Sequence, residues 1–406
     1  VEGMNSDVIA EAVVAAFDPR DDVALLGRDT AESGDAVEWG RQLDELEQRH
    51  DRVVLVSQHT NSAWRRFCVR QADRLVCLAP PQRPPDERTM PRLRGCDLVL
   101  LGEDHPASIA NMWIDRLRPR ARHRVRAGAN RNADLGRLAR RLTGTSLGLV
   151  LGGGGARGLA HLGVLEVLEE NGIVVDRVGG TSMGGIVAST FAYQLSAADR
   201  RRAVKSFFAP RVRHRYQMPP RSAVAKVEVA LETMRGVFGD QQIETLPVDL
   251  FTIAADLVAA EMVVQRRGSV AEAAMSTARI PAILPPGRSS GRLLVDGGLI
   301  RNLPVDVMAD MDEGPVIAIE VGGRFEPPTD EDGHPSLPAL GETLMRSVML
   351  GSAAAGSRVT SRAELLLEPS VSSLKMLAFG EIDKGVAIGR SEATEHLDEI
   401  RALVAR

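Results

Sequence analysis

Short apolar runs alternate with amphipathic stretches in the first third of the chain. Residues 36–50 repeat apolar side chains at helical spacing, and a G-x-x-x-x-G-K-[ST] motif is absent from this part of the sequence. Strands that alternate with helices are typical of a parallel α/β domain. We therefore predict for residues 1–130 a smaller Rossmann-like parallel α/β domain without a P-loop. Its expected strands cover residues 23–27, 52–57, 74–79 and 97–102.

The alternation continues with more strongly apolar strands from residue 146 onward. A strand at 146–152 precedes a glycine-rich loop and a helix at about 157–170, and a strand at 175–180 precedes a helix at 184–195. Residues 146–406 are therefore predicted to form a second α/β domain, ending in a long helical pattern. Its later strands are expected at 249–257, 261–267, 291–296, 315–322 and 363–369.

Arginine is concentrated between these two domains, over residues 115–144. We expect residues 131–145 to be a basic linker that carries a short amphipathic helix and whose charges are solvated. The alternative is a contact with anionic lipid headgroups, to which each arginine near the surface contributes about 1 kcal/mol.

Composition narrows the classes of function. The chain has 406 residues, 44% hydrophobic and 26% charged, and its net charge of −4 argues against a nucleic-acid binder. The sequence has no apolar run long enough to span a membrane and no secretory signal, so we expect a cytoplasmic protein. Cys68, Cys77 and Cys96 form no CxxC pair and are expected to be buried structural thiols.

A serine framed by glycines follows the second strand of the second domain. The segment GTSMG at residues 180–184 fits G-x-S-x-G, the pattern of a sharp strand-to-helix turn that presents a nucleophile. Gly180 and Gly184 leave room for the strained serine backbone. Ser182 is therefore the candidate nucleophile.

The glycine-rich loop before this serine allows two interpretations. Gly153, Gly155 and Gly158 fit G-x-G-x-x-G, and Asp176 follows at about the distance of the ribose-binding acid in a dinucleotide fold. That acid belongs at the C-terminal end of its strand, however, and this chain has Ser182 there, while Asp176 lies near the start of the strand. The order of the residues therefore favours the other interpretation, an oxyanion hole.

In an oxyanion hole, the backbone N–H groups of Gly153, Gly154 and Gly155 would stabilise negative charge at the beginning of a helix. One such donor contributes about 3 kcal/mol to catalysis. Arg157 would hold the loop or add positive potential, with Gly158 beside it; the alternative for Arg157 is an ordinary surface position on the first helical turn.

A nucleophilic serine needs a base within hydrogen-bond reach. Asp296 ends an apolar strand and is followed by Gly297 and Gly298, so its carboxylate has the setting of a catalytic group at the edge of a sheet. The alternative is an aspartate that only begins a turn.

A Ser–Asp–His triad is the competing arrangement. After Asp296, only two histidines remain: His334 lies in an acidic, proline-rich loop and His396 in the charged terminal helix. Neither follows a predicted strand, which disfavours the triad. His161, one helical turn beyond the glycine loop, is expected to be a packed helix residue.

Three motifs together resemble the patatin-like phospholipase family: GGGGARG at 152–158, GTSMG at 180–184 and DGGLIRNLPV at 296–305. Two further segments, VVLVSQHTNSAWRRFCVRQADRLVCLAP at 53–80 and RLARRLTGTSLGLVLGGGGARG at 137–158, look like the corresponding parts of bacterial relatives of neuropathy target esterase. The resemblance therefore covers most of the chain.

The resemblance implies a three-layer α/β/α catalytic domain at residues 146–406. It implies a dyad without histidine, in which Ser182 is the nucleophile, Asp296 the base and Gly153–Gly155 the oxyanion hole. The implied reaction is hydrolysis of acyl esters of phospholipids or lysophospholipids through an acyl-serine intermediate, with no metal or cofactor. For this branch it also implies a cyclic-nucleotide-binding domain upstream, outside this chain, and by analogy a regulatory role for residues 1–130.

Residues 201–222 mix aromatic side chains such as Phe207 and Tyr216 with many arginines. We predict an interfacial segment that contacts the anionic inner face of a cell membrane; the alternative is a connector with a solvated basic face. Two other functions stay open beside the esterase. One is a regulatory binding module whose esterase site is inactive or secondary, and the other is a lipid acyltransferase.

Overall fold

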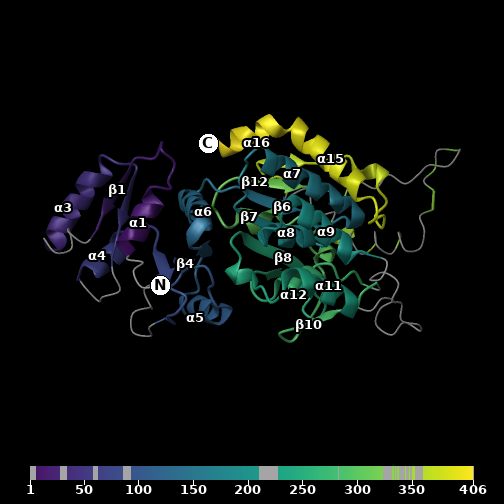
Figure 1. Cartoon of the computed structure of the whole chain (residues 1–406), viewed down its shortest axis with the longest axis horizontal. Coiled ribbons are helices and arrows are strands. Elements are labelled where there is room, and N and C mark those ends of the chain that lie inside the picture. The colour runs from purple at the N-terminus through teal and green to yellow at the C-terminus, as the bar shows by residue number, and fades with distance from the viewer. Residues whose placement is uncertain are drawn as a thin grey trace. The chain divides into compact units, whose positions relative to one another are not determined.

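The computed structural model of the chain describes residues 6–27, 34–57, 63–85, 93–209, 227–281, 283–322 and 360–405, with scattered positions within 332–352. The chain divides into two compact units, Val1–Thr143 (unit 1) and Gly144–Arg406 (unit 2) (Figure 1). Residues 210–222, the greater part of the predicted interfacial segment, lie outside the described residues.

Unit 1 is built from parallel strands and helices, as predicted, but its strands form two sheets instead of one. β1 pairs with β2, and β3, β4 and β5 form a second parallel sheet. The strands are β1 (Val23–Leu26), β2 (Arg52–Leu55), β3 (Val76–Ala79), β4 (Asp97–Leu101) and β5 (Ala121–Val125). The helices are α1 (Ser6–Val14), α3 (Ala36–Glu47), α4 (Ala63–Gln71), α5 (Ala107–Leu117) and α6 (Arg131–Thr143).

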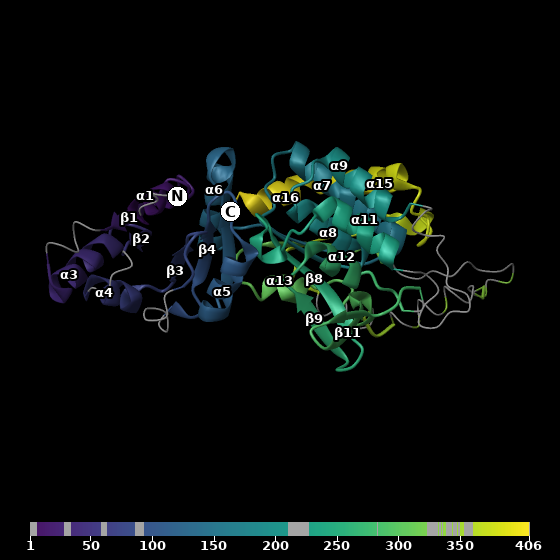
Figure 2. The ribbon, with the colours of Figure 1, turned by 60° about the horizontal axis from the view of Figure 1, so that its bottom comes forward.

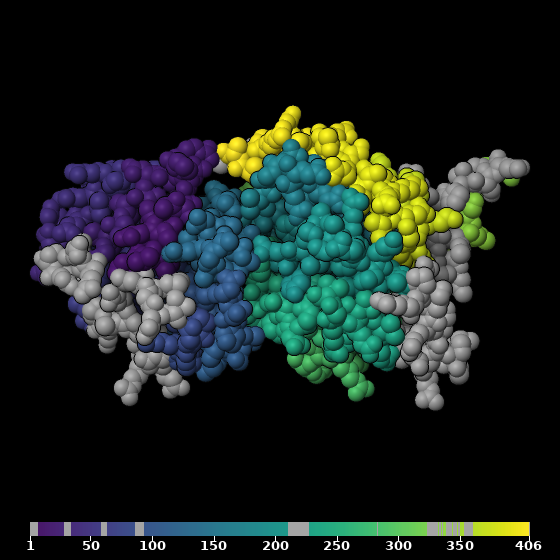
Figure 3. Space-filling view, in the orientation of Figure 1, coloured from purple at the N-terminus to yellow at the C-terminus, as the bar shows by residue number. Residues whose placement is uncertain are grey.

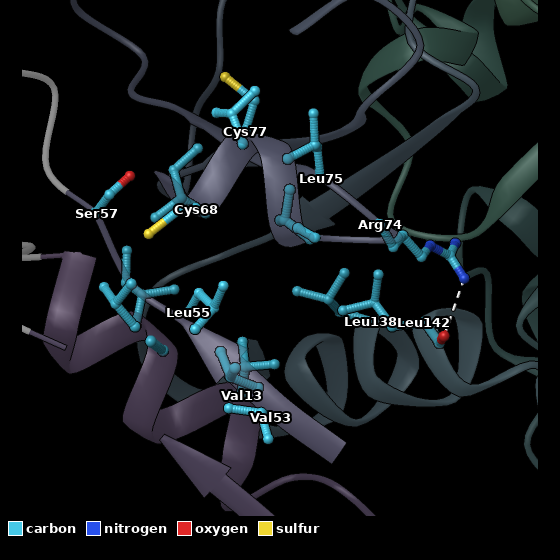
Figure 4. A pocket seen from close by; sticks show the side chains of 18 of the residues that line it. Val13, Val53, Leu55, Ser57, Cys68, Arg74, Leu75, Cys77, Leu138 and Leu142 are labelled. Carbon is cyan, nitrogen blue, oxygen red and sulfur yellow. Dashed lines mark hydrogen bonds between the residues drawn. The ribbon is translucent and has the colours of Figure 1, made fainter. Parts of the chain in front are cut away.

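A cavity of about 980 Å³ lies within unit 1 and is lined by residues of both β2 and β3. Most of the side chains around it are apolar, including Val53, Leu55, Leu75 and Leu138 (Figure 4). The three cysteines of unit 1 are free and buried, as predicted, and burial raises the pKa of the Cys68 thiol to about 12. The raised pKa keeps the Cys68 thiol protonated, so this side chain acts as a packing group.

The arginine-rich stretch differs from the predicted solvated linker. Residues 131–143 form α6, which packs Leu135 and Leu138 against β4 and β5 in the core of unit 1. Arg141 is almost completely buried, and its guanidinium donates to the Arg122 carbonyl at 2.7 Å. A buried guanidinium is stable where carbonyl or carboxylate oxygens accept its hydrogens. This basic stretch is therefore structural in unit 1.

The sequence analysis also did not predict strand β5, because buried polar residues give no apolar pattern. Its sequence, ARHRV, looks polar, yet His123 and Arg124 are buried. His123 Nε2 lies 2.8 Å from Asp97 Oδ1, and Arg124 donates to the Glu103 carbonyl at 2.7 Å. These partners lie on other elements, so the apolar pattern of the strand alone could not show them.

Unit 2 contains one sheet with the strand order β10-β11-β8-β7-β6-β12-β13, and β9 also pairs with β8. Its central strands are parallel, whereas β9 and β11 run antiparallel to β8. The strands are β6 (Gly148–Leu151), β7 (Arg177–Thr181), β8 (Asp249–Asp256), β9 (Glu261–Gln265), β10 (Gly287–Ser289), β11 (Arg292–Asp296), β12 (Val316–Ile319) and β13 (Leu365–Leu367). The strands predicted for this domain are confirmed.

Helices cover both faces of this sheet, which confirms the predicted three layers (Figure 2). Successive residues of β6 point to opposite faces. Leu149 and Leu151 join the larger core, under α7 and α8, while Val150 joins the smaller core under α13. The helices are α7 (Ala160–Glu170), α8 (Met183–Ala192), α9 (Ala197–Phe207), α11 (Glu228–Phe238), α12 (Val270–Ser276), α13 (Val305–Ala309), α15 (Ile382–Glu395) and α16 (Leu397–Val404). None of the described helices is long and apolar enough to cross a membrane.

The C-terminal helices α15 and α16 form a band over the surface of unit 2 (Figure 3). α15 crosses α7 at a close distance, which small residues allow. A Cβ atom added to Gly389 would collide with the carbonyl oxygen of Ala160, and one added to Gly163 would collide with that of Val386. The terminal helical pattern thus forms two helices that meet at His396, and α15 is fixed by contact of its backbone with that of α7.

Gly389→Ala should lower the free energy of unfolding by about 1–3 kcal/mol, because an extra methyl group cannot fit between α7 and α15. Gly236→Ala in α11 is the matched control, since an added Cβ there meets nothing within 4 Å. It should leave stability unchanged or raise it by up to about 1 kcal/mol, because alanine favours the helix. Urea unfolding of both variants provides the measurement, and equal stabilities would contradict the close contact.

Candidate active site

The turn between β7 and α8 has the strained backbone that the G-x-S-x-G pattern predicts. Ser182 has φ 54° and ψ −123°, a conformation that is rare for a residue with a side chain. A Cβ atom on Gly180 would lie 2.6 Å from the Leu151 carbonyl oxygen, and one on Gly184 would collide with the same atom. The two glycines therefore let the turn lie directly against β6.

Thr277, just after α12, holds this turn from the other side. The backbone N–H of Ser182 donates to Thr277 Oγ1 at 2.9 Å, and that hydroxyl donates to the Ile253 carbonyl at 2.5 Å. Thr277 is completely buried. Sequence reasoning missed it, because its segment showed only an alanine-rich helix followed by prolines, with no catalytic spacing to Ser182.

The sheet register brings Asp296 to Ser182. Thr181 is opposite Ile253 on one side of β8, and Asp296 is opposite Ala254 on the other side. Residue 182 and residue 296 therefore flank the same position of β8, and their side chains meet above it.

Asp296 and Ser182 form a short hydrogen bond inside the protein. Ser182 Oγ donates to Asp296 Oδ2 at 2.7 Å, and the Gly298 N–H donates to Asp296 Oδ1 at 2.8 Å. Burial raises the pKa of Asp296 to about 6, although both hydrogen bonds act to lower it. A Cβ atom on Gly297 would collide with the Ile253 carbonyl oxygen, so the chain after Asp296 needs glycine at that position.

The glycine loop joins the same site. Gly154 and Gly155 line a pocket together with Ser182 and Asp296. The N–H of Gly153 donates to the Asn302 carbonyl at 3.2 Å, whereas the N–H groups of Gly154 and Gly155 have no hydrogen-bond partner among the described residues. Within the described part of the chain, two of the three predicted donors are thus unengaged, and both glycines border Ser182.

Arg157 and Gly158 connect this loop to its surroundings. Arg157 donates from Nε to the Leu374 carbonyl at 3.1 Å and from Nη1 to the Gly322 carbonyl at 2.9 Å. It therefore holds the loop to two distant segments, as the first of the two predictions for it expected. A Cβ atom on Gly158 would collide with Met183, so this glycine lets the loop contact the start of α8.

The remaining pocket wall was not predicted. A space of about 40 Å³ beside Ser182 is lined by apolar side chains, and Phe379 in this wall stacks on Phe208 with ring centroids 4.1 Å apart. Such walls suit the beginning of an acyl chain. The apolar residues are Ile280, Pro281, Leu299, Met376, Leu377 and Phe379.

None of the histidines that the structure describes completes a triad. Among the described residues, no histidine hydrogen-bonds to Ser182 or Asp296. His161 is buried as predicted, its Nε2 lies 2.8 Å from the Gly152 carbonyl oxygen, and burial lowers its pKa to about 4. His396 ends α15 and contacts the Glu392 carbonyl.

The position of Asp176 does not fit the dinucleotide interpretation. Asp176 precedes β7 and accepts from the Leu147 N–H at 3.3 Å, at the opposite end of that strand from Ser182. In the described part of the chain, no cluster of histidine, cysteine, aspartate or glutamate side chains could hold a metal ion.

Asp296→Asn should stabilise the fold in a pH-dependent way. The pKa of Asp296 is about 6 in the folded protein and 3.8 ordinarily, so wild-type stability falls as the pH rises between these values and stays lower above them. The asparagine amide does not ionise, so the variant does not lose stability in this way. The Tm of the variant minus that of the wild type should therefore grow from pH 5 to pH 8. Asp240→Asn, on the exposed turn after α11, is the control without such growth. A constant Tm difference for Asp296→Asn would contradict a buried, ionising carboxyl group.

Comparison with known proteins identifies a family match and several relatives. The profile of the patatin-like phospholipase family matches residues 149–309. An uncharacterized NTE family protein of Mycobacterium tuberculosis is 36% identical over 379 residues, which cover 87% of this chain and 63% of that protein. Patatin-like phospholipase domain-containing protein 6 of Mus musculus is 31% identical over 366 residues, covering 80% of this chain and 26% of that protein.

The neuropathy target esterase sws of Drosophila melanogaster is 30% identical over 322 residues, covering 69% of this chain and 23% of that protein. The chain thus spans less than two thirds of the length of each of these relatives. These matches confirm the resemblance drawn from the three motifs: residues 149–309 match the patatin-like phospholipase family, and the chain is similar to an NTE family protein and to a neuropathy target esterase.

Proposed function

We propose that this protein is a serine esterase that hydrolyses acyl esters of phospholipids or lysophospholipids through a Ser182–Asp296 dyad. The observation that carries the proposal is the 2.7 Å hydrogen bond from Ser182 Oγ to a carboxylate in a buried site. A free serine hydroxyl is a weak nucleophile, and an adjacent base activates it. Burial makes Asp296 a better base than a free aspartate while leaving it ionised at neutral pH.

In the first half of the reaction, Ser182 Oγ attacks the ester carbonyl carbon while Asp296 accepts the hydroxyl proton. The carbonyl oxygen becomes an oxyanion and accepts hydrogen bonds from the N–H groups of Gly154 and Gly155. The tetrahedral intermediate then breaks its bond to the leaving alcohol, which takes the proton from Asp296. The acyl group stays on Ser182.

In the second half, a water molecule attacks the acyl-serine carbonyl carbon and gives its proton to Asp296. The same two N–H groups stabilise the second oxyanion, and the fatty acid leaves as Ser182 Oγ takes the proton back. The apolar wall formed by Met376, Leu377 and Phe379 accommodates the acyl side of the ester. An alcohol acceptor in place of water would make the same site a lipid acyltransferase.

The regulatory role of residues 1–130 is a separate proposal, supported by the apolar cavity in unit 1. A cyclic-nucleotide-binding domain upstream, a cytoplasmic location and contact with an anionic membrane stay predictions from the sequence.

Fluorophosphonate labelling tests the dyad. The probe should modify Ser182 in the wild type and fail to modify it in Asp296→Asn, because the amide cannot accept the serine proton. Peptide mass spectrometry locates the label, and Asp306→Asn, outside the dyad, is the control that should still be labelled. Labelling that survives in Asp296→Asn would place the base elsewhere. No label on the wild type, with lipid vesicles present, would instead favour a regulatory binding module with an inactive esterase site.

The pH dependence of kcat/KM tests the base. Protonated Asp296 cannot accept the serine proton, so activity should be low below pH 5 and rise through a midpoint near 6 to a plateau at neutral pH. A soluble p-nitrophenyl ester provides the measurement. A profile that stays flat between pH 5 and 8 would contradict Asp296 as the base.

A further inference from the structure

The glycine loop has two carbonyl oxygens that side chains from elsewhere hold in place. His161 Nε2 lies 2.8 Å from the Gly152 carbonyl oxygen, and Asn302 Nδ2 donates to the Gly153 carbonyl oxygen at 3.0 Å. We infer that Asn302 and His161 are positioning residues, which aim the loop's N–H groups at the oxyanion. This inference rests on the proposed esterase function, and it assigns these residues a role in the rate of the chemical step.

Peptide geometry gives the reason. In a trans peptide the C=O and the next residue's N–H point in opposite directions within one plane. When Asn302 Nδ2 holds the Gly153 carbonyl on one side, the Gly154 N–H is directed to the other side, where Gly154 borders the pocket with Ser182. The carbonyl of Gly154 accepts from the Arg157 N–H at 3.2 Å, which orients the Gly155 N–H in the same manner.

The preceding peptide is held at both of its polar ends. His161 donates to the Gly152 carbonyl, and the Gly153 N–H donates to the Asn302 carbonyl at 3.2 Å. The direction of the first bond is settled by chemistry, because a carbonyl only accepts and burial keeps His161 neutral with one N–H to give. Asn302 thus binds the loop twice, through its backbone and through its amide.

The contact between Asn302 and the loop leaves no free space. A Cβ atom on Gly153 would lie 2.5 Å from Asn302 Oδ1, and this oxygen is buried with no hydrogen-bond partner among the described residues. A buried amide oxygen without a partner is costly. The orientation of the amide is therefore explained by its Nδ2 group, which donates to the Gly153 carbonyl.

Asn302 belongs to the same loop as the proposed base. The segment runs from Asp296 to Asn302, and within it the Arg301 carbonyl accepts from Thr181 Oγ1 at 2.9 Å, beside the nucleophile. One short loop therefore contacts the nucleophile turn, carries the base and holds the oxyanion loop. This arrangement keeps the distance between base and oxyanion hole constant.

Asn302→Asp tests the amide donor with almost no change in shape. The introduced carboxylate faces the Gly153 carbonyl and repels it, so kcat should fall about 10- to 100-fold while KM for a p-nitrophenyl ester changes less than twofold. The inhibition constant of a trifluoromethyl ketone, which forms a tetrahedral adduct on Ser182, should rise by the same factor as kcat/KM falls. Asn171→Asp is the matched control, because that amide also donates to a carbonyl, of Val167, but on the exposed end of α7.

The pH dependence separates positioning from structural damage. Protonation of the introduced carboxyl group restores an O–H donor, so the ratio of kcat/KM for Asn302→Asp to that of the wild type should rise as the pH falls. A ratio that does not change with pH would overturn the role of the amide.

His161 offers a second, independent pair of variants. His161→Gln places an amide N–H near the position of Nε2, whereas His161→Leu fills the space without a donor. Leu should lower kcat about tenfold and Gln should restore most of it, with KM unchanged in both. Equal losses in the two variants would overturn the role of the His161 donor.

Ester turnover by the wild type distinguishes failure of the proposed function from failure of the positioning inference. Absence of ester turnover by the folded wild type, assayed before any labelling, would overturn the proposed function itself. If the wild type turns over ester and Asn302→Asp keeps kcat/KM and inhibitor affinity within twofold, only the positioning inference is overturned.

Discussion

The hydrogen bond between Ser182 and Asp296 depends on strand β8, which contains neither of the two residues. β8 lies between β7, which ends at the nucleophile, and β11, which ends at the carboxylate, and its Ile253 and Ala254 set the register of both neighbours. Because β7 is parallel and β11 antiparallel to β8, two chain segments more than a hundred residues apart end above the same position. A one-residue slip in either pairing would turn its side chain to the opposite face of the sheet. The burial that raises the pKa of Asp296 follows from the same arrangement, since both side chains lie inside the layered domain.

Close backbone approach explains why glycine surrounds the site. The Ser182 turn lies against the Leu151 carbonyl, the loop after Asp296 lies against the Ile253 carbonyl, and the glycine loop lies against Asn302. In each case an added Cβ atom would collide with a polar atom of the neighbouring segment. The hydrogen bonds of the glycine loop separate its carbonyl groups from its N–H groups. Carbonyls are held by donors outside the pocket, and the N–H groups of Gly154 and Gly155 are left on the side of the nucleophile.

In unit 1, buried polar side chains support the packing of the core. There, Arg124, His123 and Arg141 are buried and satisfied by carbonyl and carboxylate oxygens of neighbouring elements, and they support packing between strand and helix. Arginine can occupy such positions because its apolar stem packs while its head donates several hydrogen bonds. A basic stretch of sequence therefore belongs to the core of this unit, with a boundary to unit 2 after Thr143.

The sequence by itself determined the elements whose signal is local. Apolar runs located the strands of unit 2, and the glycines around Ser182 and Asp296 marked the two turns, because a strained turn or a close approach excludes other residue types at that position. Only the tertiary structure decided the roles of Thr277, Asn302 and the segment Met376–Phe379, along with the burial of β5 and α6. Each of these acts through a hydrogen bond or a packing contact with a distant part of the chain. A polar side chain looks the same in sequence whether it faces solvent or holds a carbonyl, and folding alone supplies the partner that makes the difference.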